Sequence, residues 1–275
     1  MLLITQKSDG YSMNTRLQGA TILPENLESG DIQLTTYSAE AVENLPSSPF
    51  LVRGGEWIDQ ILTDPSTEPL GKSVDTVQGL RTGNNTERLS TKKESENHRR
   101  ALGGEDIRRY GYDWSKKYVL YDRKLLSNDP AARPREEKYW ESSKKILVQE
   151  IRNVHLDRRI VACIDTDKYI GLNTTNTIIR KEDSDIDLEY IMAILSSTLI
   201  NQFFKACFVD NHIATQYLDA IPLFDPRSGT AFSDERMGRA WEQYESEKEL
   251  RTDAIETVRT EDLGEDDPFR TVFIS

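Results

Sequence analysis

Short apolar runs separated by polar turns fill this chain from residue 117 onward, and they constrain its fold more than any other feature. The runs are rich in β-branched and aliphatic residues, and their lengths of four to six residues are typical of strands. They cover Lys117–Tyr121, Ile146–Ile151, Ile160–Ile164 and Thr177–Arg180. The polar, proline-containing segment 127–144 is expected to be an inserted loop. This pattern predicts a domain built mostly of β-strands.

One helix is predicted between residues 188 and 203. Apolar residues recur there at spacings of three and four, which places them on one face of a helix. They are Leu188, Ile191, Met192, Leu195, Leu199 and Phe203. Three aspartates, Asp183, Asp185 and Asp187, precede this stripe, and carboxylates favour a helix N-terminus. Strands and a packed helix together predict an α+β fold that is mixed and mostly β.

The two ends of the chain differ from its middle and suggest three parts. Residues 1–49 hold strand-like runs such as Leu2–Thr5 and Ile32–Tyr37, and we expect them to be a remnant or a connector. Residues 50–225 are expected to form the main domain. Residues 226–275 combine a thin amphipathic pattern with many acidic side chains, which predicts an acidic helical extension.

The composition is typical of a protein of the cytoplasm without a membrane segment. Charged residues make up 30% of the chain, the mean hydropathy is −0.61, and no run approaches the roughly 20 apolar residues that span a bilayer. The first residues show no secretory signal. Cys163 and Cys207 are too few for a disulfide framework and are expected to be buried thiols.

Positive charge is concentrated in the middle of an acidic chain. The formal net charge is −12, but residues 79–124 hold 12 basic and 7 acidic side chains. Residues 133–159 hold 8 basic and 5 acidic side chains. Acidic surfaces of this kind occur in proteins of salt-loving organisms and in ordinary acidic cytosolic proteins, and the composition leaves both interpretations open.

A glycine- and asparagine-rich turn is the strongest local signal for binding. It reads Gln78-Gly79-Leu80-Arg81-Thr82-Gly83-Asn84-Asn85. Glycine allows positive φ and a close approach of the backbone to a ligand. The side chains of Arg81, Thr82, Asn84 and Asn85 offer donors and acceptors for phosphates or base edges. A purely structural polar turn is the alternative, and the Gly-Lys-Ser/Thr ending of a nucleotide-binding P-loop is missing.

Basic residues interleaved with aromatic ones follow this turn. A solvated charged surface is the ordinary interpretation of such a run, whereas the contrast with the acidic remainder favours contact with DNA. The residues expected to bind DNA here are Lys92, Lys93, Arg99, Arg100, Arg108, Arg109, Tyr110, Trp114, Lys116 and Lys117.

Other chemistry finds little support, so we expect no catalytic residue and no metal site. The carboxylates nearest to predicted strands are Asp122, Glu150 and Asp165, and charged strand ends are usually solvated. The histidines are far apart in the sequence and lack metal-ligand spacing; they are His98, His155 and His212.

Taken in order, these segments resemble the TaqI-like C-terminal specificity domain of adenine-specific DNA methyltransferases and fused restriction–modification enzymes. The family's opening Gly-x-x-Thr-Gly-x-Asn turn is matched by Gly79, Thr82, Gly83 and Asn85. Its Gly-x-Asp-Ile-x-x-Tyr step is matched by Gly104, Asp106, Ile107 and Tyr110. A Leu-Asn-Ser helix and an Ile-Pro end follow, although Ser196 stands in place of the asparagine. The resemblance covers about residues 50–225.

The resemblance implies that the chain docks on duplex DNA and reads a short sequence. It also implies a partner, a methyltransferase catalytic domain or subunit that holds S-adenosylmethionine, to which residues 1–49 would connect. No Asn-Pro-Pro-Tyr-type motif and no cofactor-binding glycine turn occur in this chain, so we expect neither a bound cofactor nor methyl transfer by it alone. The rival from another class is a protein-interaction subunit of a defence complex without DNA contact. An active nuclease is a further, weaker alternative.

Overall fold

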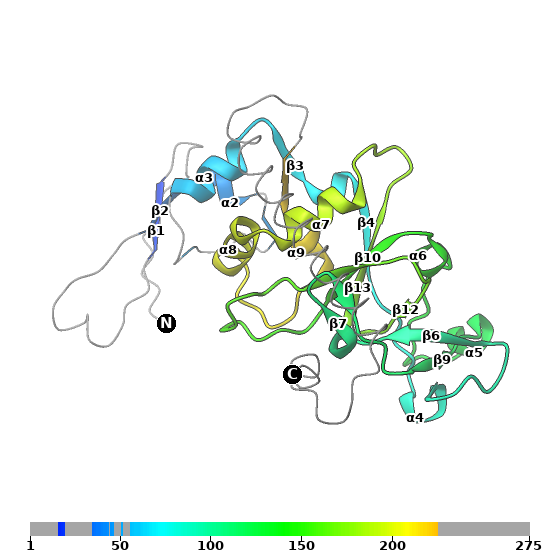
Figure 1. The fold of residues 1–275 in the computed structure, drawn as a ribbon. Helices are drawn as coiled ribbons and strands as arrows, with labels where there is room; N and C mark the ends of the chain where they lie inside the picture. Colours follow the sequence, from blue (N-terminus) through cyan, green and yellow to red (C-terminus); the bar gives the residue numbers. More distant parts are fainter. Residues whose placement is uncertain (1–15, 20–34, 44, 47–50, 52–55, 225–275) are drawn as a thin grey trace, which may run out of the picture.

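The computed structural model describes residues 16–19, 35–43, 45–46, 51 and 56–224, which form an α+β fold (Figure 1). The predicted fold class is thereby confirmed. The run Leu2–Thr5 and the expected acidic helical extension 226–275 lie outside the described residues, as does most of the expected connector. Among the described residues, no helix is long and apolar enough to cross a membrane.

A four-stranded antiparallel sheet forms the centre of the fold. Its strand order is β11-β10-β13-β4, with Leu147 of β10 opposite Cys163 of β11 and Thr177 of β13. The strands are β4 (Val74–Gln78), β10 (Lys145–Gln149), β11 (Ala162–Asp165) and β13 (Thr175–Arg180). Three of the four predicted strand runs therefore belong to this sheet. Cys163 and Cys207 are buried free thiols, as expected.

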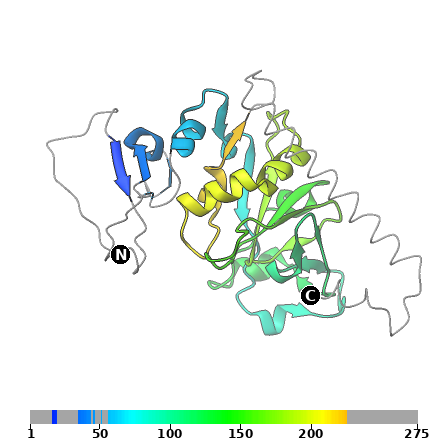
Figure 2. The ribbon, with the colours of Figure 1, turned by 60° about the vertical axis from the view of Figure 1, so that its left-hand side comes forward.

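Three helices pack on one face of this sheet, as Figure 2 shows for the two longest. They are α7 (Leu188–Ser196), α8 (Thr198–Cys207) and α9 (Thr215–Asp219). Ile146 and Val148 of β10 share a core with Ile191 and Phe204 of these helices, because alternate residues of a strand face the same side. Leu147 faces the other side and belongs to a second cluster.

The predicted helix 188–203 is broken at Ser197, so the prediction of one continuous helix was wrong. The backbone of Ser197 is extended, with φ −67° and ψ 151°, and its Oγ accepts a hydrogen bond of 3.2 Å from the N–H of Ile200. Serine favours this N-cap geometry because its short side chain satisfies a free backbone donor. The apolar stripe continues across the break and hides it from a periodicity argument.

A second four-stranded sheet, in the order β12-β6-β9-β5, packs beside the first. Its strands are β5 (Leu89–Ser90), β6 (His98–Leu102), β9 (Tyr118–Leu120) and β12 (Ile170–Gly171). The predicted run Lys117–Tyr121 is thus confirmed as β9. The segment 127–144 differs from the expected loop, because Trp140 of α6 (Lys138–Glu141) and Ala132 are buried in this sheet's apolar cluster. Two buried side chains anchor a segment whose polar composition suggested exposure.

Shorter elements complete the described part of the chain. Three short strand pairs are antiparallel: β1 with β2, β3 with β14, and β7 with β8. Their bounds are β1 (Arg16–Gly19), β2 (Thr35–Ser38), β3 (Thr67–Pro69), β7 (Ile107–Arg108), β8 (Gly111–Tyr112) and β14 (Pro222–Phe224). The remaining helices are α2 (Ala39–Glu43), α3 (Glu56–Thr63), η1 (Leu70–Lys72), α4 (Asn85–Arg88), η2 (Gly104–Asp106) and α5 (Arg123–Ser127).

Candidate nucleic-acid interface

The glycine turn leaves the end of β4 and is fixed to the last residue of β12 and the first residue of β13. The N–H of Gly79 donates to the carbonyl of Thr175 at 2.8 Å, and that of Leu80 donates to Gly171 at 2.7 Å. A Cβ at Gly79 would lie 2.1 Å from the carbonyl oxygen of Leu172, so only glycine permits this approach. The turn is therefore held at the edge of the central sheet.

Gly83 has φ +82°, the left-handed conformation that glycine adopts without strain. The turn around it is closed by its own side chains. Thr82 is buried, and its hydroxyl donates to the side-chain oxygen of Asn85. Asn84 caps α4 by accepting from the N–H of Glu87 at 3.3 Å. In this structure these three polar side chains serve the turn itself, and their contact with base edges stays a prediction.

Arg88 ties the turn to the segment that follows α5. This buried arginine donates to the carbonyl of Thr82 and pairs with Asp129 at 2.7 Å. The backbone N–H of Ala131 and the Arg88 guanidinium hold the pKa of Asp129 below its usual value. Arg81, by contrast, is exposed, and its side chain forms no hydrogen bond or ion pair with the described residues. It is the member of the turn that is available to a ligand.

Residues 133–140 line the turn on its other side, which the sequence did not indicate. The N–H of Arg133 donates to the carbonyl of Arg81 at 2.8 Å, and the two residues form an antiparallel bridge. The Nε of Arg135 donates to the carbonyl of Gln78 at 2.5 Å. Tyr121 donates its hydroxyl hydrogen to the carbonyl of Arg135. The net positive charge of residues 133–159 was the one signal that could have drawn attention to this segment.

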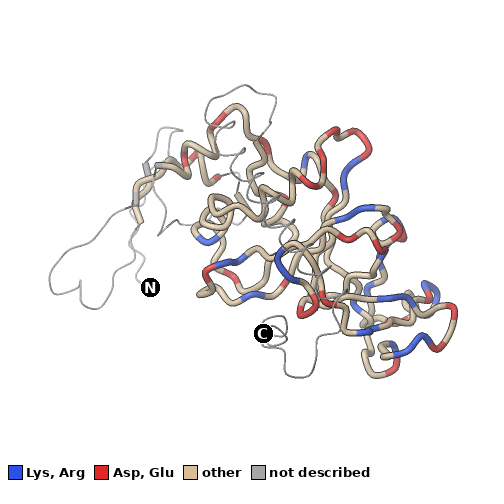
Figure 3. The backbone as a smooth tube through the Cα atoms, in the orientation of Figure 1, with Lys and Arg blue, Asp and Glu red and all other residues tan. Residues whose placement is uncertain are grey.

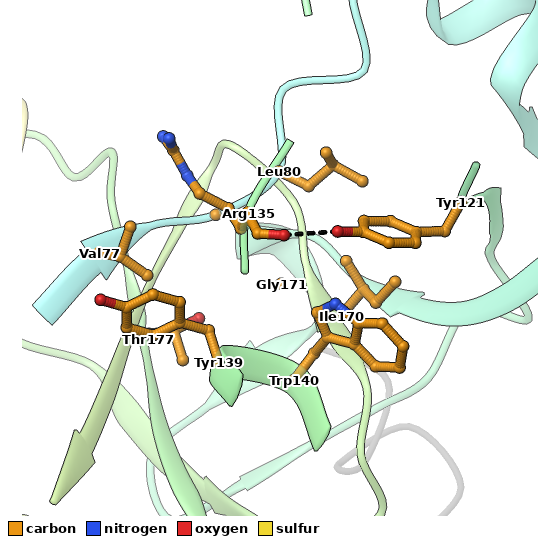
Figure 4. A pocket seen from close by; sticks show the side chains of 10 residues that line it. Val77, Leu80, Tyr121, Arg135, Tyr139, Trp140, Ile170, Gly171 and Thr177 are labelled. Atoms are coloured by element: carbon orange, nitrogen blue, oxygen red, sulfur yellow. Dashed lines mark hydrogen bonds between the residues drawn. The ribbon is translucent and has the colours of Figure 1, made fainter. Parts of the chain in front are cut away.

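An aromatic cleft lies beneath this segment (Figure 4). Its walls include Leu80, Tyr121, Tyr139, Trp140 and Ile170. The guanidinium of Arg135 points away from the cleft, whereas the buried Nε1 of Trp140 has no hydrogen-bond partner among the described residues.

The predicted basic residues near β6 keep their charges at the surface, and they alternate with acidic ones along the chain (Figure 3). Lys92 and Lys116 are exposed, and Lys93 pairs with the neighbouring Glu96 at 3.0 Å. The Arg99 guanidinium lies 5.4 Å from the ring centre of Trp140. These are the residues that phosphate groups could approach without breaking a buried contact.

Arg100 is fixed by two contacts on the loop that follows β11. Its guanidinium lies 4.5 Å from the ring centre of Tyr169 and donates to the carbonyl of Asp167 at 2.8 Å. These contacts fix the orientation of the Arg100 guanidinium, so its free N–H groups are already in place to bind a phosphate.

The remaining predicted residues have structural partners. Arg108 pairs with Asp113 at 3.0 Å, and Arg109 lies 4.7 Å from the ring centre of Tyr110. Trp114 donates its Nε1 hydrogen to the carbonyl of Lys117 at 3.1 Å. Burial lowers the pKa of Lys117, but two carboxylates outweigh it and raise this pKa overall. Those carboxylates belong to Glu105 and Asp106. Lys117 is therefore charged but already neutralised.

The carboxylates considered from the sequence are separated in the structure. Asp122 caps α5, Glu150 accepts from His212 at 2.7 Å, and Asp165 forms a fully buried pair with Lys145 at 2.5 Å. Within the described ranges, no three His, Cys, Asp or Glu residues are grouped so as to hold a metal ion.

The described residues thus form a sheet-rich α+β domain with a fixed glycine turn and exposed arginines. The model of the TaqI-like C-terminal specificity domain matches residues 99–223, which confirms the resemblance drawn from the sequence. The match begins after the glycine turn, so the turn lies outside it. No curated protein matches the chain.

Among solved structures, the chain is similar to a Type IIL restriction–modification enzyme, MmeI, whose structure was determined in complex with DNA. The sequences are 13% identical and the TM-score is 0.37. The similarity covers 69% of this chain and 28% of that chain, so this chain spans well under a third of the enzyme's length.

Proposed function

We propose that this chain is the sequence-specific DNA-recognition part of an adenine-specific (N6) DNA methyltransferase or restriction–modification enzyme. The observation that supports this most directly is the match of residues 99–223 to a specificity domain. The exposed arginine of a rigid glycine turn, Arg81, adds a group of the kind that reads base edges.

Binding divides between two kinds of contact. Exposed basic residues such as Lys92, Arg99 and Lys116 neutralise phosphates and set the register on the duplex. The glycine turn approaches the base edges, and Arg81 reaches them first. Thr82 and Asn85 contribute only if duplex binding replaces the hydrogen bond between their side chains.

Methyl transfer belongs to a partner domain or subunit in the cytoplasm. The partner holds S-adenosylmethionine and flips the adenine out of the duplex, because the exocyclic amine cannot be methylated within the base stack. The sequence of this chain contains no Asn-Pro-Pro-Tyr-type motif to grip a flipped adenine. Its own task is to position that partner on the target sequence.

Selection from a pool of randomised duplexes by the purified chain tests this function. Repeated binding and sequencing should enrich one short motif, and a scrambled competitor should fail to displace that motif in a retardation assay. Equal retention of all sequences contradicts the proposal. Adding magnesium and labelled duplex to the same sample tests the nuclease alternative, which predicts that the duplex is cleaved.

A protein-interaction subunit without DNA contact is the second candidate, and one observation favours it. Three exposed large apolar residues, Ile151, Leu156 and Val209, lie on two neighbouring loops. The loops are joined by the N–H of Arg152, which donates to the carbonyl of Asn211 at 2.9 Å. Exposed apolar groups of this kind fit a protein partner. Absence of any DNA retardation at low salt would favour this candidate.

A further inference from the structure

Arg81 and Arg133 face each other across two short backbone segments. They form an antiparallel bridge, and both side chains are exposed. Residues directly opposite in such a bridge have Cβ atoms roughly 4.5–5.5 Å apart on one side of the ladder. Like charges in this arrangement destabilise the free protein. The main-chain hydrogen bond between the two residues would form equally well without either charge. The Arg133 guanidinium also donates to the carbonyls of Pro130 at 2.6 Å and Ala132 at 2.7 Å, whereas the Arg81 side chain has no such partner among the described residues. The fold therefore does not explain the charge of Arg81.

Arg135 brings a third positive charge to the same place. It lies two positions after Arg133, and the charge of Arg133 is close enough to lower the pKa of Arg135. Its Nε is engaged with the carbonyl of Gln78 at 2.5 Å, while its two terminal nitrogens form no hydrogen bond with the described residues. Burial and the charge of Arg133 both lower the pKa of Arg135, so the free protein is a poor environment for this cation.

The anchored Nε distinguishes Arg135 from an ordinary surface arginine. A guanidinium that is fixed through Nε presents its outer edge, with two parallel N–H groups, in one direction. Figure 4 shows this edge leaving the aromatic cleft rather than filling it. The complementary ligand has two acceptors side by side. In duplex DNA, the O6 and N7 atoms of guanine in the major groove form such a pair.

We propose that Arg135 reads a guanine of the recognised sequence by donating to its O6 and N7 atoms. This inference rests on the proposed DNA-recognition function. Arg81 and Arg133 supply the positive potential that draws the acceptor edge toward the turn, and the guanine relieves the repulsion among the three arginines. Residues 133–140 are thus part of the recognition surface rather than an inserted loop.

The test uses the duplex that the full chain selects and a single-atom change in the DNA. Each guanine of that duplex is replaced in turn by 7-deazaguanine, which loses the N7 acceptor but keeps normal base pairing. At one guanine the unmodified chain should lose affinity, while Arg135→Ala should bind the normal and deaza duplexes equally. The unmodified chain should also prefer the selected duplex over a duplex in which that base pair is replaced by another. Arg135→Ala should reduce this preference by about 5- to 150-fold, the range for one bidentate contact. Arg135→Lys keeps the charge and can still donate to O6 or N7, but it lacks the fork, so it should lose only part of this discrimination.

Arg152 provides the matched control. It is also half-buried, its Nε also donates to a backbone carbonyl, that of Arg158 at 3.0 Å, and burial also lowers its pKa. Arg152→Lys should leave the response to every deaza substitution unchanged. Thermal unfolding of all variants shows whether they are folded.

The outcomes separate the two proposals. If the unmodified chain selects no motif, the proposed function fails and this inference fails with it. If it selects a motif but no guanine responds to Arg135→Ala, or the motif contains no guanine, the function stands and this inference is overturned. A uniform loss of affinity for all sequences also overturns it, because that result assigns Arg135 to phosphate binding.

Discussion

Gly83→Val is the change that most directly tests whether the glycine turn takes part in recognition. Gly83 has φ +82°, which a β-branched residue adopts only under strain. A Cβ at this position would lie 2.6 Å from Oδ2 of Asp129 and 3.0 Å from the backbone nitrogen of Ala132. Valine therefore strains the backbone and pushes Asp129 away from Arg88.

The backbone conformation of Gly83 alone bounds the loss of folding free energy in this variant. A non-glycine residue in the left-handed region costs about 1–2 kcal/mol. For a domain of this size such a loss lowers the melting temperature by about 2–8 °C if the native turn is retained. If the turn instead adopts another conformation, the native turn becomes about 5- to 30-fold rarer, and DNA affinity falls by the same factor. In both cases the sheet core under α7 is spared, because Gly83 does not contact it.

Fluorescence titration with the selected duplex and thermal unfolding measure the two quantities. Asp129→Ala is the control, since it removes the partner of Arg88 without changing the backbone at Gly83. Gly83→Val should weaken DNA binding more than Asp129→Ala does. If the valine variant binds the duplex with unchanged affinity, the turn is a structural element and not part of the interface.

Four other outcomes are expected. Lys92→Ala should weaken binding to all duplexes alike and make the log–log salt dependence shallower by about one unit, because one phosphate contact is lost; an unchanged slope in salt titrations would show that Lys92 belongs to a solvated surface. The hydrogen bond to Glu150 raises the pKa of His212, so His212→Gln should cost most stability below pH 6.5, and this cost should shrink as the pH rises through the raised value, as urea unfolding at several pH values can show. Lys145→Met should destabilise by about 3–5 kcal/mol because it leaves the buried Asp165 carboxylate without its cation, whereas adding Asp165→Asn should recover part of the loss in the same unfolding assay, because the amide is neutral and its oxygen still accepts from the backbone N–H of Asp167 or Tyr169. The purified chain alone should transfer no tritiated methyl group from S-adenosylmethionine to DNA, and reproducible transfer by highly purified samples would refute its assignment as a recognition part.

Strand positions were predictable because β-branched runs carry their own signal. The runs at 146–151, 160–164 and 177–180 became β10, β11 and β13, shifted by at most two residues at their ends. Their pairing order was not predictable, since β4 joins the same sheet from residues 74–78, about 100 positions before β13. Such long-range pairing depends on packing between segments, which local patterns do not contain.

The break at Ser197 shows a different limit of prediction from the sequence. The periodic stripe was correct, since all its members are buried in the two helices except Leu199, which is half-buried. The side chain of Ser197 competes with the backbone for hydrogen bonds, and serine does so within helices as well as at their starts. Only the observed geometry shows which choice it makes.

The sequence indicated only part of the candidate site, and the chemistry of its residues explains why. The positive φ of Gly83 followed from glycine's conformational freedom, and the turn's polar side chains stood out in the sequence. Their mutual bonding did not, because Thr82 and Asn85 are equally suited to bind each other and a base. Arg133 and Arg135 were missed because polar composition alone suggested an exposed loop. The buried ring of Trp140 holds that loop against the turn.

The net negative charge of the chain does not oppose DNA binding by the described domain. Residues 56–224 hold 25 basic and 27 acidic side chains, a net charge of −2, whereas residues 225–275 hold 7 and 14, so most of the net charge of −12 belongs to the flanks. At 0.1 M salt the Debye length is about 10 Å, and a bound phosphate therefore senses its neighbours rather than the net charge. Near the glycine turn those neighbours include Arg81, Arg133 and Arg135, while the carboxylate of Asp129 is already paired with Arg88. Removing residues 225–275 should consequently speed association at low salt and leave the preference among sequences unchanged, because steering depends on total charge and reading depends on contacts.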